Sequence, residues 1–292
     1  MSYHIQVANA NQIKLMINWA RLEGWNPGLK DEILFPLVDP AGFFIGLLDN
    51  KPINAISNVK YSNDFSFLGL YIVEPSYRHQ GFGYQIWQHA LKCSGNANCG
   101  LDGVASEQVN YIKSGFKLAH RNIRYKFINQ IFNYRQNNLI LANRVSVDQI
   151  LNYDKSFFPA SRKNFLPSWV NSDKAESLLY QDNNQILGYG VIRRCYEGYK
   201  IGPLFANSIK IAESILYGLC SMIKLNELIY LDTPELNLQA KQLVESLGMQ
   251  MIIETSRMYN KYIPDISLNR TCGITSFEIG LINLTINIME LI

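Results

Sequence analysis

The stretch from Leu68 to Tyr84 constrains the fold more than any other part of this sequence. It begins with an apolar segment that ends before Pro75, which is typical of a strand, and an apolar stripe at helical spacing begins at Phe82. Gly81 and Gly83 lie where that helix starts. Residues without Cβ let a pyrophosphate approach the unpaired N–H groups of a helix N-terminus, where the helix dipole also favours negative charge. The stretch therefore predicts a strand, a phosphate-binding loop and a helix.

The glycine pattern of this loop excludes two common nucleotide sites. The Gly-Lys-Ser/Thr of a P-loop is missing, and so is the third glycine of the dinucleotide fingerprint. The pattern that is present, Arg78-x-x-Gly81-x-Gly83 after Val73-Glu74-Pro75, resembles the acetyl-CoA loop of the GNAT N-acetyltransferases. That resemblance implies acetyl-CoA as the cofactor and an α/β (α+β) fold with a mixed, mostly antiparallel sheet between helices.

The resemblance also implies which residues hold the cofactor. In that family the strand splays from its neighbour, so its backbone pairs with the pantetheine amides and exposes an N–H that polarises the thioester carbonyl. The side chain of His79 is expected to point to solvent, and Arg78 either adds charge at the phosphates or braces the turn. The implied cofactor residues are Leu70, Tyr71, Ile72, Val73, Arg78, His79, Gln80, Gly81, Phe82, Gly83 and Tyr84.

A helix that ends before Phe116 carries a candidate general acid. Residues 110–116, Asn-Tyr-Ile-Lys-Ser-Gly-Phe, resemble the family's Leu-Tyr-x-Lys-x-Gly-Phe and differ from it at Asn110. The tyrosine of that motif protonates the departing CoA thiolate, which implies this role for Tyr111. Half-buried packing is the alternative role of such a tyrosine.

The acceptor must lose a proton before it attacks, because an unperturbed alkyl ammonium has a pKa of about 10.4. Four carboxylates are available near the expected site: Glu23, Asp31, Glu74 and Asp102. Asp102 is the best single candidate for the base, since it ends a strand inside an apolar run. A turn role for Asp102 and a base carried by water both stay open.

Residues 25–28, Trp-Asn-Pro-Gly, form a turn cluster that Asp31 follows as a possible helix cap. In a GNAT fold this loop overhangs the acyl end of the cofactor. The resemblance therefore implies Trp25, Asn26 and Asp31 as candidate acceptor residues. An anchored turn with Trp25 buried is the alternative.

The second half of the chain repeats the pattern of the first. Leu231-Asp232 echoes Leu101-Asp102, and the nine positions from Gly115 to Arg124 recur from Gly248 to Arg257, which indicates an internal duplication. The segment of residues 202–208 has no glycine where the following helix starts, so a pyrophosphate cannot approach the backbone closely there. We therefore expect the second half to bind no CoA.

These features predict three segments. Residues 1–128 form an acetyl-CoA-binding domain, the amide-rich residues 129–138 a linker, and residues 139–292 a degenerate GNAT-like domain. Motifs of the second half, among them Gly273-Ile274-x-x-x-Glu278, resemble the C-terminal domain of tandem bacterial GNAT proteins. We expect the second domain to shape the acceptor pocket against the first.

Composition excludes other classes of protein. A net charge of +3 without a basic run argues against nucleic acid, and five cysteines without a Cys-x-x-Cys pair argue against a disulfide framework or a metal site. Residues 1–7 do not resemble a signal peptide, and the apolar stretch 280–292 is shorter than the roughly 20 residues of a membrane helix. A cytoplasmic protein that binds no membrane is expected.

The sequence as a whole predicts an N-acetyltransferase. It would move an acetyl group from acetyl-CoA to an amine of a small-molecule or peptide acceptor, by direct attack in a ternary complex. An acyl-CoA-binding sensor without turnover is the alternative, and a structural protein with a relic loop is a third possibility.

Overall fold

The structure is a computed structural model that describes residues 2–132 and 138–280. The apolar stretch at the C-terminus, after Gly280, lies outside the described residues. The elements of the first half are β1 (Tyr3–Val7), α1 (Ala10–Leu22), α2 (Asp31–Leu34), β2 (Phe43–Leu48), β3 (Lys51–Lys60), β4 (Phe65–Val73), α3 (Phe82–Ser94), β5 (Asn98–Val104), α4 (Gln108–Lys113) and β6 (Lys117–Ile128).

The second half repeats this alternation of strands and helices. Its elements are β7 (Leu139–Leu141), α5 (Val147–Asp154), α6 (Leu166–Val170), β8 (Ala175–Asp182), β9 (Gln185–Arg194), β10 (Tyr199–Ala206), α7 (Ile209–Ser221), β11 (Leu228–Pro234), α8 (Leu238–Ser246), β12 (Gln250–Tyr259) and β13 (Thr271–Gly273). None of the helices in the described ranges is long and apolar enough to cross a membrane.

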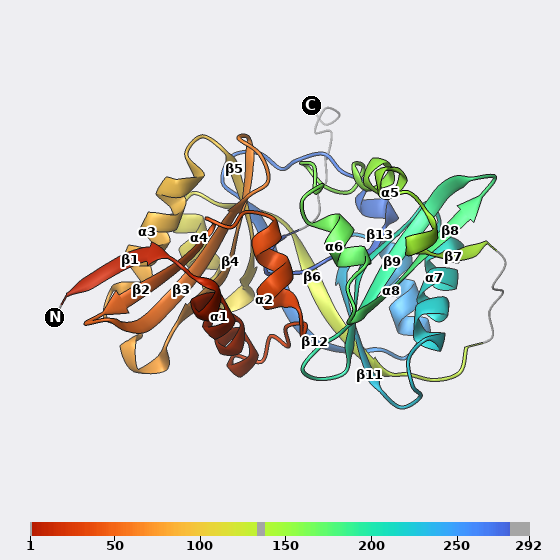
Figure 1. The fold of residues 1–292 in the computed structure, drawn as a ribbon, viewed down its shortest axis with the longest axis horizontal. Coiled ribbons are helices and arrows are strands. Elements are labelled where there is room, and N and C mark those ends of the chain that lie inside the picture. Colours follow the sequence, from red (N-terminus) through yellow and green to blue (C-terminus); the bar gives the residue numbers. More distant parts are fainter. Residues whose placement is uncertain (1, 133–137, 281–292) are drawn as a thin grey trace, which may run out of the picture.

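The described strands form one mixed sheet that runs through both halves (Figure 1). Its order is β1-β2-β3-β4-β5-β12-β6-β11-β10-β9-β8-β7, and β13 pairs with β10 off this path. β12 lies antiparallel between β5 and β6, while β6 pairs with β11. Each half therefore gives one strand to the other, which differs from the sheet of its own that the sequence predicts for each domain.

Helices cover both faces of this sheet. Phe43 and Ile45 of β2 face the buried stripe of α1, in a core that continues across the molecule to Trp169 of α6. Phe44, between them, faces the opposite side, where it belongs to the core around Ile86 of α3. This period of two is the alternation that a strand imposes on its side chains.

Residues 271–280, here called the crossing segment, join the two halves. Their first three residues are β13, and the N–H of Ile274 then donates to the carbonyl oxygen of Asp232 at 2.8 Å. A Cβ built on Gly69 of β4 would lie only 1.9 Å from the carbonyl oxygen of Glu278. The segment thus runs from the sheet of the second half to β4 of the first.

Candidate active site

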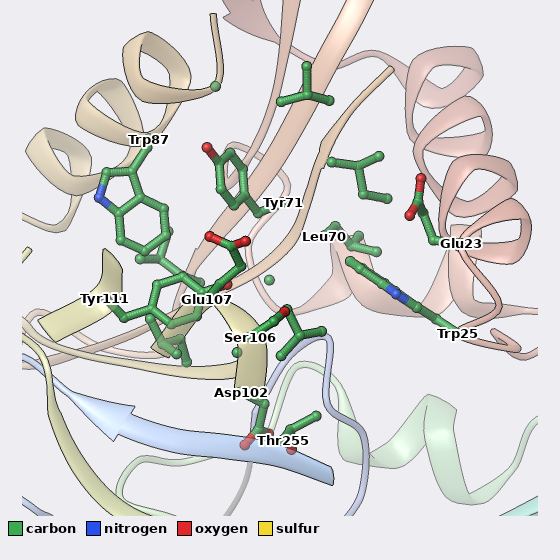
Figure 2. Close-up of a pocket in the computed structure, with 18 of the residues that line it drawn as sticks. Glu23, Trp25, Leu70, Tyr71, Trp87, Asp102, Ser106, Glu107, Tyr111 and Thr255 are labelled. Atoms are coloured by element: carbon green, nitrogen blue, oxygen red, sulfur yellow. The ribbon is translucent and has the colours of Figure 1, made fainter. Parts of the chain in front are cut away.

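A cavity of about 630 Å³ opens where β4 and β5 diverge. The two strands pair in parallel from Phe65 with Asn98 to Leu68 with Leu101, and their pairing stops there. Figure 2 shows Trp87, Tyr71 and Tyr111 on one side of this cavity and Trp25 with Glu23 on the other. The splay that the sequence comparison implied is therefore present in the first half.

A bulge in β4 directs its backbone at the cavity. The register between β3 and β4 shifts between Ala55 and Ser57, and Leu70 has a φ of 46°. Bulges of this kind re-aim backbone groups beside active sites. The segment from Leu70 to Val73 lines the cavity beyond the last residue that pairs with β5.

The glycine loop lies at the start of α3. Gly81 is the N-cap residue with a φ of 84°, and His79 has a φ of 62°. Gly83 packs against Tyr71, because a Cβ there would come within 2.6 Å of the tyrosine hydroxyl oxygen. Two left-handed residues before a helix N-terminus turn successive N–H groups towards one concavity, which suits an anion.

Arg78 braces this loop. Its Nε donates to the carbonyl oxygen of Val73 at 2.9 Å, and its guanidinium forms an ion pair with Glu23. The arginine charge is thus partly neutralised, although its side chain remains 40% exposed at the edge of the cavity.

Most of the predicted cofactor residues line the cavity, and two do not. Those that line it are Leu70, Tyr71, Ile72, Val73, Arg78, His79, Gly81, Gly83 and Tyr84. Gln80 turns away, and its side-chain amide donates to the carbonyl oxygen of Ser76 at 2.9 Å. The ring of Phe82 packs on Tyr3, with 5.0 Å between ring centroids. These two side chains stabilise the loop and the strand behind it.

Tyr111 is held in the wall by aromatic contacts. Its ring centroid lies 5.5 Å from that of Trp87, and a Cβ on Gly103 would lie 2.0 Å from its ring. Burial, together with the negative charge of Glu107, raises the pKa of its hydroxyl, which stays protonated at neutral pH. A protonated hydroxyl at a cavity wall can donate a proton or a hydrogen bond.

Asp102 lines the cavity, but other residues already bind its carboxylate. Arg257 Nε donates to its Oδ1 at 2.7 Å, Asn122 donates to the same oxygen at 2.9 Å, and Arg257 Nη2 bonds to Oδ2. The side chains of Asp102 and Arg257 are both 0% exposed. A carboxylate bonded on both oxygens and shielded in this way is badly placed to take a proton from an acceptor.

The three candidate acceptor residues separate in the structure. Trp25 lines the cavity. The side chain of Asn26 instead donates to the carbonyl oxygen of Glu197 at 2.8 Å and accepts from the N–H of the same residue at 2.9 Å. Asp31 is buried in an ion pair with Arg193, whose Nη1 lies 2.8 Å from Oδ1. Asn26 and Asp31 therefore bind the second half and do not line the cavity.

Several lining residues have no counterpart in the sequence predictions. Trp87, Ser106 and Glu107 come from the first half, and Ile253, Thr255, Phe277 and Glu278 come from the second. Arg124 also lines the cavity, and its Nε and Nη2 donate to Asp232 at 2.6 and 2.7 Å. Two of these residues belong to patterns in the sequence, Arg124 to the duplicated spacing and Glu278 to the end of a motif. Neither pattern indicated that the residue lines a cavity.

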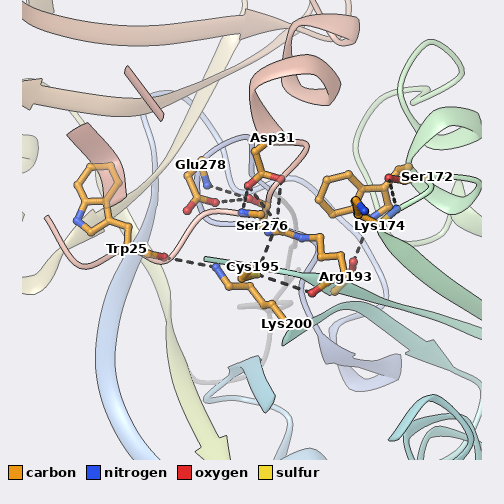
Figure 3. A network of polar contacts seen from close by, with 12 residues as sticks. Trp25, Asp31, Ser172, Lys174, Arg193, Cys195, Lys200, Ser276 and Glu278 are labelled. Atoms are coloured by element: carbon orange, nitrogen blue, oxygen red, sulfur yellow. Dashed lines mark hydrogen bonds and ion pairs between the residues drawn. The ribbon is translucent and has the colours of Figure 1, made fainter. Parts of the chain in front are cut away.

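Buried charges lie near Trp25 and Glu278, two residues that line the cavity, and Figure 3 labels Asp31, Arg193 and Lys200 among them. The carboxylates are Asp31, Asp232 and Glu278, and the cations are Arg124, Arg193 and Lys200. Lys200 Nζ donates to the carbonyl oxygen of Trp25 at 3.5 Å. Burial and the neighbouring charge of Arg124 lower its pKa.

Comparison with known proteins identifies the family. The family model described as "Acetyltransferase (GNAT) family" matches residues 11–108. A second model, described as "Acetyltransferase (GNAT) domain", matches residues 150–269. The chain belongs to the GNAT family. Its GNAT sequences thus occur in tandem, and it is an N-acyltransferase that uses an acyl-CoA donor and an amine acceptor.

Three proteins that resemble this tandem GNAT protein match most of its length. Holothin acyltransferase of Pseudoalteromonas sp. (strain SANK 73390) is 24% identical over 273 residues, which are 94% of this chain and 93% of that protein. A putative acetyltransferase from Pyrococcus horikoshii has a TM-score of 0.81 at 22% identity and covers 95% of this chain and 96% of its own. A tandem GNAT protein from the clavulanic acid biosynthesis pathway has a TM-score of 0.59 at 8% identity, covering 88% and 98%.

Proposed function

We propose that this GNAT protein transfers an acetyl group from acetyl-CoA to the amine of a small acceptor, by direct attack within a ternary complex. The observation that supports this most is one continuous cavity, which extends from the glycine loop along the part of β4 that does not pair with β5 to Trp25. Its volume of about 630 Å³ lies within the usual range for small-molecule sites. A small acceptor and a short acyl group both suit an inner end that protein surrounds.

The first half would bind the donor through its backbone. The N–H groups from His79 to Gly83 would hold the diphosphate, and the backbone of Leu70 to Val73 would pair with the pantetheine amides. Acetyl-CoA supplies an activated thioester when bound. The N–H of the bulge would donate to the thioester oxygen as negative charge develops on it.

Tyr111 would act as the general acid. Its hydroxyl would deliver a proton to the sulfur as the carbon–sulfur bond breaks. The acceptor would lose one proton to water before it attacks, and the second proton that its nitrogen loses on forming the amide would pass through water and restore the Tyr111 hydroxyl. The net change converts the acetyl thioester and an amine into an amide and free CoA thiol. Asp102 has no part in this scheme, because Arg257 and Asn122 occupy its carboxylate.

The second half would carry no cofactor. β10 and β11 also stop pairing in parallel, after Ile201 with Leu231, but β13 then pairs with β10 at Leu204 and Phe205. The chain thus occupies the gap that the pantetheine would need. The following helix, α7, has Ser208 as its N-cap residue, whose side chain accepts from the N–H of Ile211. These features support the predicted division into a cofactor-binding domain and a degenerate one.

Substitution of Gly81 tests this proposal. We expect Gly81→Leu to abolish acetyl-CoA binding in calorimetry, because a side chain at a φ of 84° would distort the loop and cover its N–H groups. Gly95→Leu is the matched control, since Gly95 also has a positive φ, 58°, but follows the C-terminus of the same helix. Normal acetyl-CoA affinity in Gly81→Leu would remove the loop from the site.

Turnover is measured by release of CoA thiol over a panel of amines. Acetyl-CoA binding with amine-dependent thiol release supports the acetyltransferase. Acetyl-CoA binding without release of CoA thiol for every amine in the panel would instead favour a sensor that binds acyl-CoA. Absence of binding would contradict both.

A further inference from the structure

Glu278 is a buried carboxylate that the proposed chemistry does not use. It lines the cavity although the residue is only 3% exposed. The crossing segment carries it there from the second half, and its carbonyl oxygen contacts Gly69. Gly69 directly precedes the bulge at Leu70, where we place the reacting thioester. Glu278 is therefore at the inner end of the cavity, close to the expected acyl group.

The carboxylate of Glu278 is incompletely paired. Within residues 2–132 and 138–280, its hydrogen-bond donor is the hydroxyl of Ser276, and it has no ion pair within 4.0 Å. In Figure 3 the carboxylate points to the side where Trp25 lies and away from Arg193. A carboxylate with one hydrogen-bond donor can accept further hydrogen bonds from a ligand in the cavity.

The nearby cations are mostly committed to other groups. Arg124 pairs with Asp232 and also donates to the carbonyl oxygen of Trp25 at 2.8 Å, and Arg193 pairs with Asp31. Burial alone would raise the pKa of Glu278, but the charges of Lys200 and Arg124 outweigh it and lower that pKa. Glu278 is therefore ionised at neutral pH and can accept hydrogen bonds from a cation.

We propose that Glu278 binds the ammonium group of the acceptor and selects a cationic amine with an apolar body. This inference rests on the proposed acetyltransferase function. N–H groups of the bound ammonium would donate to Glu278, and Trp25, Leu70 and Phe277 would contact the carbon skeleton. One ammonium proton would then leave to water before the nitrogen attacks the thioester. Glu278 is thus a specificity-determining residue that the second half contributes to the site of the first.

The other cavity carboxylates fit this role less well. Glu23 is paired with Arg78 at the outer edge. Glu107 accepts from the Asn110 side chain at 2.7 Å, and it lies beside Tyr71 and Tyr111, close to the expected path of the pantetheine (Figure 2). Asp102 is enclosed by Arg257.

The test compares acceptors that differ only in charge. Cyclohexylamine and benzylamine, which are cationic at neutral pH, serve as acceptors, and cyclohexanol and benzyl alcohol serve as neutral competitive inhibitors. Glu278→Gln keeps the size of the side chain and an oxygen for Ser276. We expect it to raise the KM for the amines about tenfold to a hundredfold, the effect of losing a charged hydrogen bond. The Ki of the alcohols and the Kd of acetyl-CoA should stay within about twofold.

Two variants provide comparison. Glu254→Gln removes a carboxylate of the same half that is paired with Arg121 outside the cavity, and it should leave every constant unchanged. If Glu278→Gln does not fold, Glu278→Asp retracts the charge by one methylene and should raise the amine KM in the same direction.

An unchanged KM for the amines in folded Glu278→Gln would overturn the inference. A rise in that KM in Glu107→Gln, without one in Glu278→Gln, would also overturn it. Both results leave the acetyltransferase proposal intact if the wild type releases thiol. A wild type that binds acetyl-CoA but acylates no amine overturns both proposals.

Discussion

The ion pair between Asp102 and Arg257 is predicted to stabilise the exchange of β12 into the first half. Asp102→Asn preserves the shape of the side chain but leaves the guanidinium of Arg257 buried without its counter-charge. Breaking one partner of such a pair costs about 3–5 kcal/mol. That is a large share of the roughly 5–15 kcal/mol that a folded domain has in total. We therefore expect a fall of roughly 10 °C in Tm.

Chemical unfolding measures this loss directly. Urea titrations followed by circular dichroism should give a lower free energy of unfolding with an unchanged m value. The duplicate pair provides a second case, because Arg124 and Asp232 are buried in the same way, and Asp232→Asn should have a similar effect. Glu254→Gln is the control, since its pair with Arg121 is partly exposed to solvent and is worth no more than about 1 kcal/mol.

The same variant separates a structural role from a catalytic one. If Asp102 only holds the strands together, folded Asp102→Asn should keep its turnover at temperatures well below its Tm. A variant with wild-type stability and at least about a hundredfold lower kcat would show that Asp102 is the base despite its contacts with Arg257 and Asn122.

Two further predictions concern the acid and the exchanged strand. Tyr111→Phe should lower kcat by about a hundredfold or more while the Kd of acetyl-CoA stays constant, and unchanged turnover would contradict a general acid there. Ending the chain at residue 138 removes β12 from between β5 and β6, so the first half should lose cooperative unfolding and acetyl-CoA affinity together. A fragment that is folded and binds acetyl-CoA normally in calorimetry would show that β12 is dispensable.

Local signals in the sequence were enough for the glycine loop. The strand that ends before Pro75, the two glycines and the helix are adjacent in the chain, and the structure has β4, Gly81 and α3 in that order. The bulge at Leu70 left no such signal, because a leucine with a positive φ does not differ from its neighbours in the sequence.

The strand exchange could not be predicted in this way. Both halves have an aspartate two residues before the end of a strand and an arginine on a later strand, so the sequence allows either aspartate as the partner of each arginine. The structure pairs Arg257 with Asp102 and Arg124 with Asp232, across the halves in both cases. Strand pairing is decided by long-range contacts, which hydrophobic periodicity does not encode.

Asn26 and Asp31 show the same limit. Their place in a loop of polar and turn-forming residues suggested a pocket wall, since loops often carry binding residues. Their partners, Glu197 and Arg193, are more than 160 positions away and belong to the second half. The polar character of this loop reflects an interface inside the molecule.

The crossing segment makes the two halves differ at the point where their parallel strands separate. Parallel pairing ends at Leu68 in the first half and at Ile201 in the second, and in both a glycine follows, Gly69 or Gly202. The crossing segment touches both: a Cβ on Gly202 would lie 2.5 Å from the carbonyl oxygen of Ile274, and one on Gly69 would lie 1.9 Å from that of Glu278.

At the second-half glycine the segment also enters the gap as β13, whereas at the first-half glycine it only reaches the inner end and leaves a cavity of about 630 Å³. If the second half binds no cofactor, as we propose, the missing loop glycines are therefore not the only obstacle. Restoring glycines before α7 should not create acetyl-CoA binding there, because β13 would still occupy the strand edge that the pantetheine requires. The peptide that closes one site thus delivers Glu278 to the other.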